Sequence, residues 1–163
     1  MGAPSSPSPG VSVGDVTLDQ RLCLALYTAS RAMTARYRPS LADLGLTYPQ
    51  YLVMVLLWEQ GASSVTAIGQ GLTLDSSTLS PLLKRLQAMG LVTRTRAATD
   101  ERLMIIGLTE QGAAMQTEAA HVAVDLCEAT GLPLVNQLEL VQTLHELTSE
   151  LDASTRAALA RQA

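Results

Sequence analysis

The spacing of apolar residues changes from a helical period to a period of two between residues 64 and 108, and this change constrains the fold more than any other feature. Val65, Ile68 and Leu72 are spaced to bury one face of a short helix. Beyond Asp75, a residue type that caps helix starts, a second amphipathic stripe comprises Leu79, Leu82, Leu83 and Leu86. Two short helices joined by a turn predict a helix-turn-helix. Pro81 removes one backbone hydrogen bond from the second helix, so we expect a kink there and not a break.

After Gly90, which we expect to end the second helix, apolar and polar residues alternate over 91–96 and again over 103–108. The polar stretch between these runs predicts a β-hairpin with a charged tip. Helical patterns on both sides predict helices from about Asp15 to Tyr37, Pro49 to Gln60, Thr109 to Thr130 and Leu134 to Leu159. Pro39 is expected to end the first of these helices, because the residue before a proline is pushed out of the α region.

This order of elements predicts a mainly α fold with a small β-hairpin wing: a winged helix-turn-helix whose N- and C-terminal helices form a dimerisation domain. The outer helices carry more apolar surface than a small winged helix can cover, so we expect a homodimer to bury it. We divide the chain into a disordered tail (1–14), N-terminal helices for dimerisation and sensing (15–62), a DNA-binding winged helix-turn-helix (63–110) and C-terminal dimerisation helices that carry a second cysteine (111–163).

The charge distribution leaves the partner open. A net charge of −4 argues against bulk binding of a polyanion. Residues 84–102, however, hold five basic and two acidic side chains, whereas the remaining chain holds six basic and thirteen acidic. A positive segment on an acidic body is typical of a localised nucleic-acid contact, and it also occurs on a merely uneven surface. The charge count alone does not distinguish a nucleic-acid contact from an uneven surface.

Several classes of protein are excluded. No apolar run approaches the roughly 18 residues that cross a membrane, and residues 1–14 lack the pattern of a secretion signal. Two cysteines are too few for a zinc site or a disulfide scaffold, so we expect a cytoplasmic protein. His121 and Cys127 do not have ligand spacing and His145 stands alone, so no metal is expected. No phosphate loop or nucleophile elbow is present, and we expect no cofactor.

Specific segments resemble the MarR family of dimeric winged-helix regulators. They are Leu72–Leu86, Gly90–Val92, Asp100–Arg102 and Leu108–Gly112. Within that family, Leu22–Ser30 and Leu46–Met54 are similar to the OhrR branch, whose members sense organic hydroperoxides through a cysteine. The resemblance covers about residues 18–131.

The resemblance implies that Cys23 is the peroxidatic cysteine and that Tyr27, Tyr37 and Tyr48 stabilise its thiolate. Tyr27 lies one helical turn from Cys23, but Tyr37 is 14 residues on, roughly 21 Å along the axis. It therefore cannot reach the cysteine of its own helix, although it could reach that of a partner. In the family, the residues matching Tyr37 and Tyr48 hydrogen-bond the partner's cysteine, and phenolic donors favour a thiolate. The alternative is that these tyrosines only pack in the hydrophobic core and have no role at the cysteine.

Two further expectations concern the surroundings of Cys23. We expect little help from the helix dipole, because Cys23 lies several residues past the predicted helix start. We also expect an apolar pocket that selects organic peroxides, lined by Leu22, Leu26, Val53, Met54 and Leu57.

Cys127 is matched by a cysteine of an OhrR subgroup that resolves the sulfenic acid as an intersubunit disulfide. The resemblance therefore implies that Cys127 is the resolving thiol. Sequence spacing does not test this pairing, because a disulfide needs Cα atoms within roughly 7 Å. The alternative is an inert, buried thiol beside Leu126.

DNA contacts are expected from the second helix of the helix-turn-helix, whose N-terminal end enters the major groove in this architecture. The candidates there are Asp75, Ser76, Ser77, Thr78, Ser80, Lys84 and Arg85. The short polar residues could instead only cap the helix, and the two basic residues could simply be solvated. In the wing, the resemblance implies that Arg102 enters the minor groove and that Asp100 orients it. Arg94 and Arg96 share one strand face, consistent with backbone contacts.

We therefore expect a repressor, not an enzyme, that binds a pseudo-palindromic operator in double-stranded DNA. An organic hydroperoxide would oxidise Cys23 and release the operator. Two alternatives remain at this point. The first is a MarR-type repressor controlled by reversible binding of a small aromatic ligand, for which the cysteines would be dispensable. The second is a thiol-dependent peroxidase, which would leave the helix-turn-helix and basic wing without a purpose.

Overall fold

The computed structural model describes residues 16–97, 100 and 103–162. The predicted tail 1–14 and Arg102 lie outside these residues. The chain divides between Ala114 and Met115 into two compact units. The predicted fold class is confirmed: helices predominate, and a small antiparallel sheet is the only other regular structure among the described residues.

The first unit begins with a 3₁₀ turn, η2 (Leu18–Gln20), and a long helix, α1 (Leu22–Ala42). The prediction that Pro39 ends this helix is wrong, because α1 continues through it. A proline so close to the C-terminus removes a single backbone hydrogen bond, and the extra turn buries Leu41, which is 1% exposed. Gly45, with φ of +66°, turns the chain towards the next helix.

Helix α2 (Tyr48–Gln60) has strong signals at both ends, and its predicted bounds are accurate to one residue. Thr47 and Gln50 form a capping box at its start. Gly61, with φ of +75°, closes its C-terminal end. Val53, Met54 and Leu57 are at most 1% exposed, so α2 supplies the centre of the core.

The predicted helix-turn-helix is present as α3 (Val65–Leu72) and α4 (Ser76–Ala88). Ser64 caps α3, and its hydroxyl accepts from the Ala67 N–H at 3.1 Å. The turn places Thr73 in the left-handed region at φ 53°. Helix α4 runs on through Pro81, as predicted, and buries the four leucines of its stripe.

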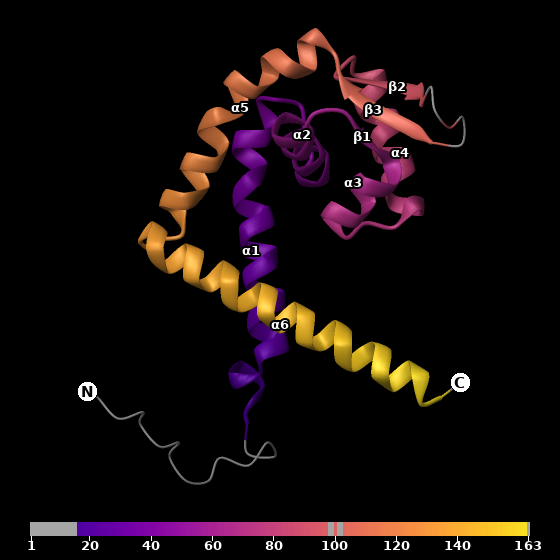
Figure 1. Cartoon of the computed structure of the whole chain (residues 1–163). Helices are drawn as coiled ribbons and strands as arrows, with labels where there is room; N and C mark the ends of the chain where they lie inside the picture. The colour runs from indigo at the N-terminus through magenta and orange to yellow at the C-terminus, as the bar shows by residue number, and fades with distance from the viewer. Residues whose placement is uncertain (1–15, 98–99, 101–102, 163) are drawn as a thin grey trace, which may run out of the picture. The chain divides into compact units, whose positions relative to one another are not determined.

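The predicted hairpin consists of β2 (Val92–Arg96) and β3 (Met104–Leu108), with Val92 opposite Leu108. A third strand, β1 (Ser63–Ser64), pairs with the other edge of β3, giving the order β1-β3-β2. Two residues are too few to show a strand period, so the sequence did not predict β1. Figure 1 shows α3 and α4 gathered beside these strands.

Helix α5 (Glu110–Ala129) starts in the first unit and continues into the second. Thr109 joins its first turn to the base of the wing: its hydroxyl donates to the Gly90 carbonyl at 2.6 Å and accepts from the Gly112 N–H at 3.0 Å. The Trp58 indole Nε1–H of α2 donates to the Gly112 carbonyl at 2.9 Å. The start of α5 is therefore tied to both α2 and the wing.

The second unit holds the rest of α5 and a long helix, α6 (Leu134–Ala160), separated by Gly131 at φ +67°. The Gln137 side-chain amide joins them by donating to the carbonyl of Cys127 at 3.1 Å. Many apolar side chains of α6 are exposed. No helix in the described part of the chain is long and apolar enough to span a membrane.

Candidate functional site

Cys23 lies in the first turn of α1, which corrects our prediction that this helix starts near Asp15. Arg21 is the N-cap and has an extended backbone (φ −78°, ψ 123°), so α1 begins at Leu22 and Cys23 is its second residue. The first N–H groups of a helix have no intrahelical acceptor, and they favour negative charge nearby. The Cys23 thiol is free and exposed. The Cys23 thiol is therefore accessible from solution.

Tyr27 follows one turn after Cys23 and is paired with Arg31 a further turn along α1. The Arg31 Nη1 donates to the Tyr27 hydroxyl oxygen at 2.9 Å, and the guanidinium carbon lies 5.5 Å from the ring centroid. Tyr27 is 58% exposed. The phenolic O–H proton remains available for donation, because the arginine occupies only the oxygen's acceptor side.

Tyr37 and Tyr48 come together in an aromatic cluster between α1 and α2. Their ring centroids are 4.6 Å apart, Tyr37 lies 5.8 Å from Tyr51, and Tyr51 lies 6.3 Å from Trp58. Burial raises the pKa of Tyr48 above its usual value of 10.0. The pKa of Tyr51 is raised by burial and then by the nearby Tyr48 and Glu59. Both phenols therefore keep their protons, and remain hydrogen-bond donors, at neutral pH.

Cys23 and the aromatic cluster are far apart within one chain. Residues 23 and 37 occupy one continuous helix, so about 21 Å of helix axis separates them. The expected apolar pocket is not formed by one chain either. Val53, Met54 and Leu57 have almost no exposed surface to line a pocket, whereas Leu22 is 58% exposed.

Cys127 lies near the end of α5 in the second unit, and its thiol is free and exposed. Its carbonyl oxygen accepts from the Thr130 hydroxyl at 2.8 Å and from the Gln137 amide. Its neighbour Leu126 is 8% exposed. The alternative is therefore wrong about burial of this thiol, because the helix turns Leu126 inward and Cys127 outward. Whether the thiol is inert or resolving stays a prediction.

The start of α4 presents short polar side chains around a capped first turn. Asp75 is the N-cap, and its carboxylate oxygen accepts from the Ser77 hydroxyl at 2.5 Å and from the Thr78 N–H at 2.7 Å. These hydrogen bonds, led by that of Ser77, hold the pKa of Asp75 below its usual value. The other predicted contacts on α4 are exposed or half-buried: Ser76, Ser77, Thr78, Ser80, Lys84 and Arg85.

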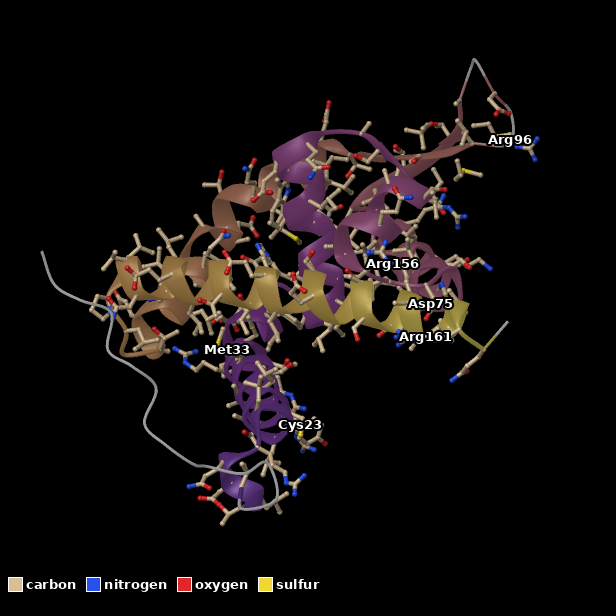
Figure 2. The ribbon with its side chains drawn as sticks, turned by 60° about the horizontal axis from the view of Figure 1, so that its bottom comes forward. Cys23, Met33, Asp75, Arg96, Arg156 and Arg161 are labelled. Carbon is tan, nitrogen blue, oxygen red and sulfur yellow. The ribbon has the colours of Figure 1, made fainter. Side chains whose placement is uncertain are left out.

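The wing carries its basic side chains on β2. Arg96 is exposed, and Figure 2 shows it at the far end of the hairpin, well away from Cys23. Arg94 is half-buried, and its Nε atom has no hydrogen-bond partner among the described residues. Asp100 is exposed. Arg102, which we predicted to work with Asp100, lies outside the described residues. No cluster of metal-ligating side chains occurs in the described part of the chain.

Similarity to known proteins assigns this chain to a family. Residues 35–118 match the family model described as transcriptional regulator SarA/Rot. The organic hydroperoxide resistance transcriptional regulator of Bacillus subtilis is 43% identical over 137 residues, which cover 79% of this chain and 92% of the relative. The chain belongs to the MarR family, in its OhrR branch. A second relative of this MarR-family chain, the HTH-type regulator TtmR of Methylorubrum extorquens, is also 43% identical, covering 84% of this chain and 70% of the relative.

Solved structures agree with this MarR-family assignment. Reduced AbfR bound to DNA superposes with a TM-score of 0.68 at 35% identity, covering 82% of this chain and 93% of AbfR. Disulfide-formed AbfR gives a TM-score of 0.59 at 40% identity, covering 80% and 92%. Wild-type MarR of Escherichia coli, at 22% identity and a TM-score of 0.64, shares the fold.

Sequence reasoning missed two residues of the aromatic cluster in this MarR-family chain: Tyr51 and Trp58. Tyr48 and Tyr51 are three residues apart, a spacing that places them on one side of a helix, and this signal was available. The Trp58–Gly112 hydrogen bond spans 54 residues of sequence, so no local pattern could indicate it.

Proposed function

We propose that this MarR-family chain is a homodimeric repressor that binds an operator and releases it when an organic hydroperoxide oxidises Cys23. The observation that carries the proposal is the position of Cys23, an exposed thiol in the first turn of α1. A thiol in such a position can be reached by a peroxide from solution. Residues 15–62 would sense and dimerise, 63–110 would bind DNA, and 111–163 would dimerise and supply Cys127.

In the first chemical step, the Cys23 thiolate attacks the terminal oxygen of the hydroperoxide. The O–O bond breaks, the alkoxide leaves and takes up a proton to form an alcohol, and Cys23 becomes a sulfenic acid. In the second step, the thiol of the partner's Cys127 attacks the sulfenic sulfur, an S–S bond forms, and water leaves. Both cysteines are exposed, which supports this sequence of steps.

Two copies of α1 would let the tyrosines approach a cysteine, which they cannot do within one chain. If α1 of one protomer runs antiparallel to that of its partner, the Tyr37–Tyr48 pair of one chain approaches Cys23 of the other. The retained phenolic proton of Tyr48, which packs against Tyr37, suits donation to a thiolate, and Tyr27 would donate from the helix that carries this cysteine. Exposed apolar residues on α1 and the turn before it, among them Leu18, Leu22 and Met33, support its burial in a dimer.

DNA binding would use the first turns of α4 in the major groove and the wing beside it. Exposed Ser76, Ser77 and Thr78 suit contacts to bases and phosphates, and Arg94 and Arg96 suit the backbone. AbfR, which shares this fold at 35–38% identity, has been solved on DNA in reduced and overoxidised forms. We infer that the intersubunit disulfide, and not oxidation of Cys23 alone, releases the operator of this chain.

The test treats wild type, Cys23→Ser and Cys127→Ser proteins with cumene hydroperoxide, then runs non-reducing gels and operator-binding assays. Wild type should form a dimer band and release DNA. Neither variant should form that band, and both should stay on DNA, because neither can form the disulfide. A Cys23→Ser protein that still leaves DNA on peroxide treatment would end the proposal and favour control by a reversibly bound ligand.

A further inference from the structure

We propose that Gln137 is a positioning residue for disulfide formation: its side-chain amide holds the end of α5 against the start of α6, and so holds Cys127 back in the reduced protein. The inference rests on the proposed function, because it concerns the second chemical step given there. It adds a residue that acts through the main chain of Cys127 and not on its sulfur.

The Gln137 amide joins two carbonyl groups across the corner between α5 and α6. Its Nε2 donates to the Cys127 carbonyl oxygen at 3.1 Å and to the Leu132 carbonyl oxygen at 2.9 Å. A side-chain amide has two N–H donors, so both are used here. Gln137 is half-buried, whereas Asn136 and Leu138 on either side of it are exposed. The amide is therefore partly enclosed by the corner that it joins.

The Cys127 carbonyl accepts a second side-chain hydrogen bond, from Thr130. This carbonyl is one of the last four of α5, which have no N–H partner within the helix. The Thr130 hydroxyl donates to it at 2.8 Å and accepts from the Leu132 N–H at 3.1 Å. The hydrogen bonds that Gln137 and Thr130 donate are called the corner clamp below. They tie the last turn of α5, which carries Cys127, to the first turn of α6.

The two chemical steps place opposite demands on the space around Cys23. The organic hydroperoxide must first reach the Cys23 sulfur, and the partner's Cys127 must then reach the same atom. In the second step the S–S bond forms, the S–O bond of the sulfenic acid breaks, and the released hydroxide takes up the thiol proton to leave as water. A Cys127 already in contact with Cys23 would block the peroxide. Cys127 therefore has to approach after the first step, until the two Cα atoms lie within roughly 7 Å.

The corner clamp opposes this approach. The main chain of Cys127 cannot move relative to α6 until the hydrogen bonds from Gln137 and Thr130 are broken. A hydrogen bond of this kind makes a modest net contribution, so its loss changes a rate by a factor of about two to ten. The first step takes place at Cys23, in the other compact unit of the chain, and does not involve the clamp. The clamp therefore slows the second step alone.

Gln137→Met tests the clamp, because it removes both N–H donors, adds no charge and keeps a side chain of similar length. Cumene hydroperoxide is added at a concentration that completes the first step rapidly, and the disulfide is followed on non-reducing gels of quenched samples. Gln137→Met should form the disulfide at least about threefold faster than wild type. Asn136→Met removes an exposed amide from the neighbouring position and should react at the wild-type rate.

Thr130→Val provides a second variant, because it removes the other donor to the Cys127 carbonyl. It should also form the disulfide faster than wild type. Its matched control is Thr143→Val, which removes a hydroxyl that donates to the Glu139 carbonyl at 2.9 Å within α6. This control leaves the corner intact and should react at the wild-type rate.

Two further measurements separate positioning from a general effect on folding. In a Cys127→Ser background, dimedone trapping followed by mass spectrometry should show that Gln137→Met does not alter the rate of sulfenic acid formation at Cys23. In protein that retains both cysteines, loss of the clamp destabilises only the reduced form. The equilibrium constant for disulfide formation against glutathione should therefore rise by about the same factor as the rate. A merely structural role would lower thermal stability without changing this constant.

Equal disulfide rates in wild type and Gln137→Met would overturn the inference and leave the proposed function standing. A slower rate in Gln137→Met would overturn it as well, because the amide would then guide Cys127 towards Cys23. If wild type forms no disulfide with the peroxide, the proposed second step and this inference fail together.

Discussion

The environment of Cys23 depends on the backbone of one residue, Arg21. Its extended conformation separates the 3₁₀ turn at Leu18–Gln20 from α1, which therefore starts at Leu22 and not near Asp15. A shift of the helix start by two turns towards the N-terminus would bury the N–H groups beside Cys23 in helical hydrogen bonds. The same cysteine would then lie in the middle of a helix, with no free N–H groups beside it.

Replacing Gly112 with alanine adds a single methyl group, and we expect it to lower the stability of the fold strongly. A Cβ atom built there would lie 2.0 Å from the Leu91 carbonyl oxygen, which is backbone and cannot step aside. Gly112→Ala should therefore lower the free energy of unfolding by at least about 2 kcal/mol, despite the higher helix propensity of alanine. Urea denaturation at constant m-value measures this difference.

Ala113→Gly is the matched control for Gly112→Ala. It changes helix propensity in the same turn of α5 at an exposed position, and it should cost no more than about 1 kcal/mol. A Gly112→Ala protein as stable as wild type would show that the first turn of α5 can move away from the wing.

At the scale of elements, the start of α4 links stability to pH through Asp75. Hydrogen bonds from Ser77 and Thr78 lower the pKa of this carboxyl in the folded protein. The stabilisation is therefore present above the unfolded pKa of about 3.9, and it is lost as the pH falls through the lower folded value. An asparagine in place of Asp75 would cap the helix without titrating.

Comparison of wild type with Asp75→Asn from about pH 7 to about pH 3 isolates this effect, because all other titrating groups are shared. The stability advantage of wild type should be constant near neutral pH and should shrink at the acid end. An advantage that does not vary with pH would mean that the carboxylate makes no charge-specific contribution to the cap.

At the scale of the whole molecule, the exposed apolar surface of the second unit predicts a partner. Leu134 and Leu138 are 63% and 61% exposed, Val141 is 47% exposed, and the three share one face of α6. Soluble proteins seldom leave such stripes in contact with water. A second copy of the chain, as the proposed function requires, would cover them.

Leu138→Glu should therefore shift the protein from dimer to monomer at micromolar concentration, as measured by sedimentation equilibrium. A charge buried in an apolar interface costs several kcal/mol of association free energy, on the order of a thousandfold in affinity. Asn136→Glu places the same charge on the opposite face of α6 and should leave the dimer intact. A dimeric Leu138→Glu protein would move the interface away from this face.

Features that depend on neighbouring residues were predictable from the sequence alone. The helix-turn-helix, the hairpin, the Asp75 cap and the stop at Gly61 were all indicated by apolar periodicity, capping residues and glycines, which act within a few residues. The family followed from motifs of the same local kind. The roles of Cys23, Cys127 and the DNA-contacting residues remain predictions.

Features that depend on contacts between distant segments were decided only by the tertiary structure. Burial of Leu41 carries α1 past Pro39, and pairing with β3 makes a strand of two serines. The packing of α1 on α2 brings Tyr37 onto Tyr48. Local sequence sets which conformations a segment prefers, but burial energies gained across the chain decide where a helix ends and which side chains meet.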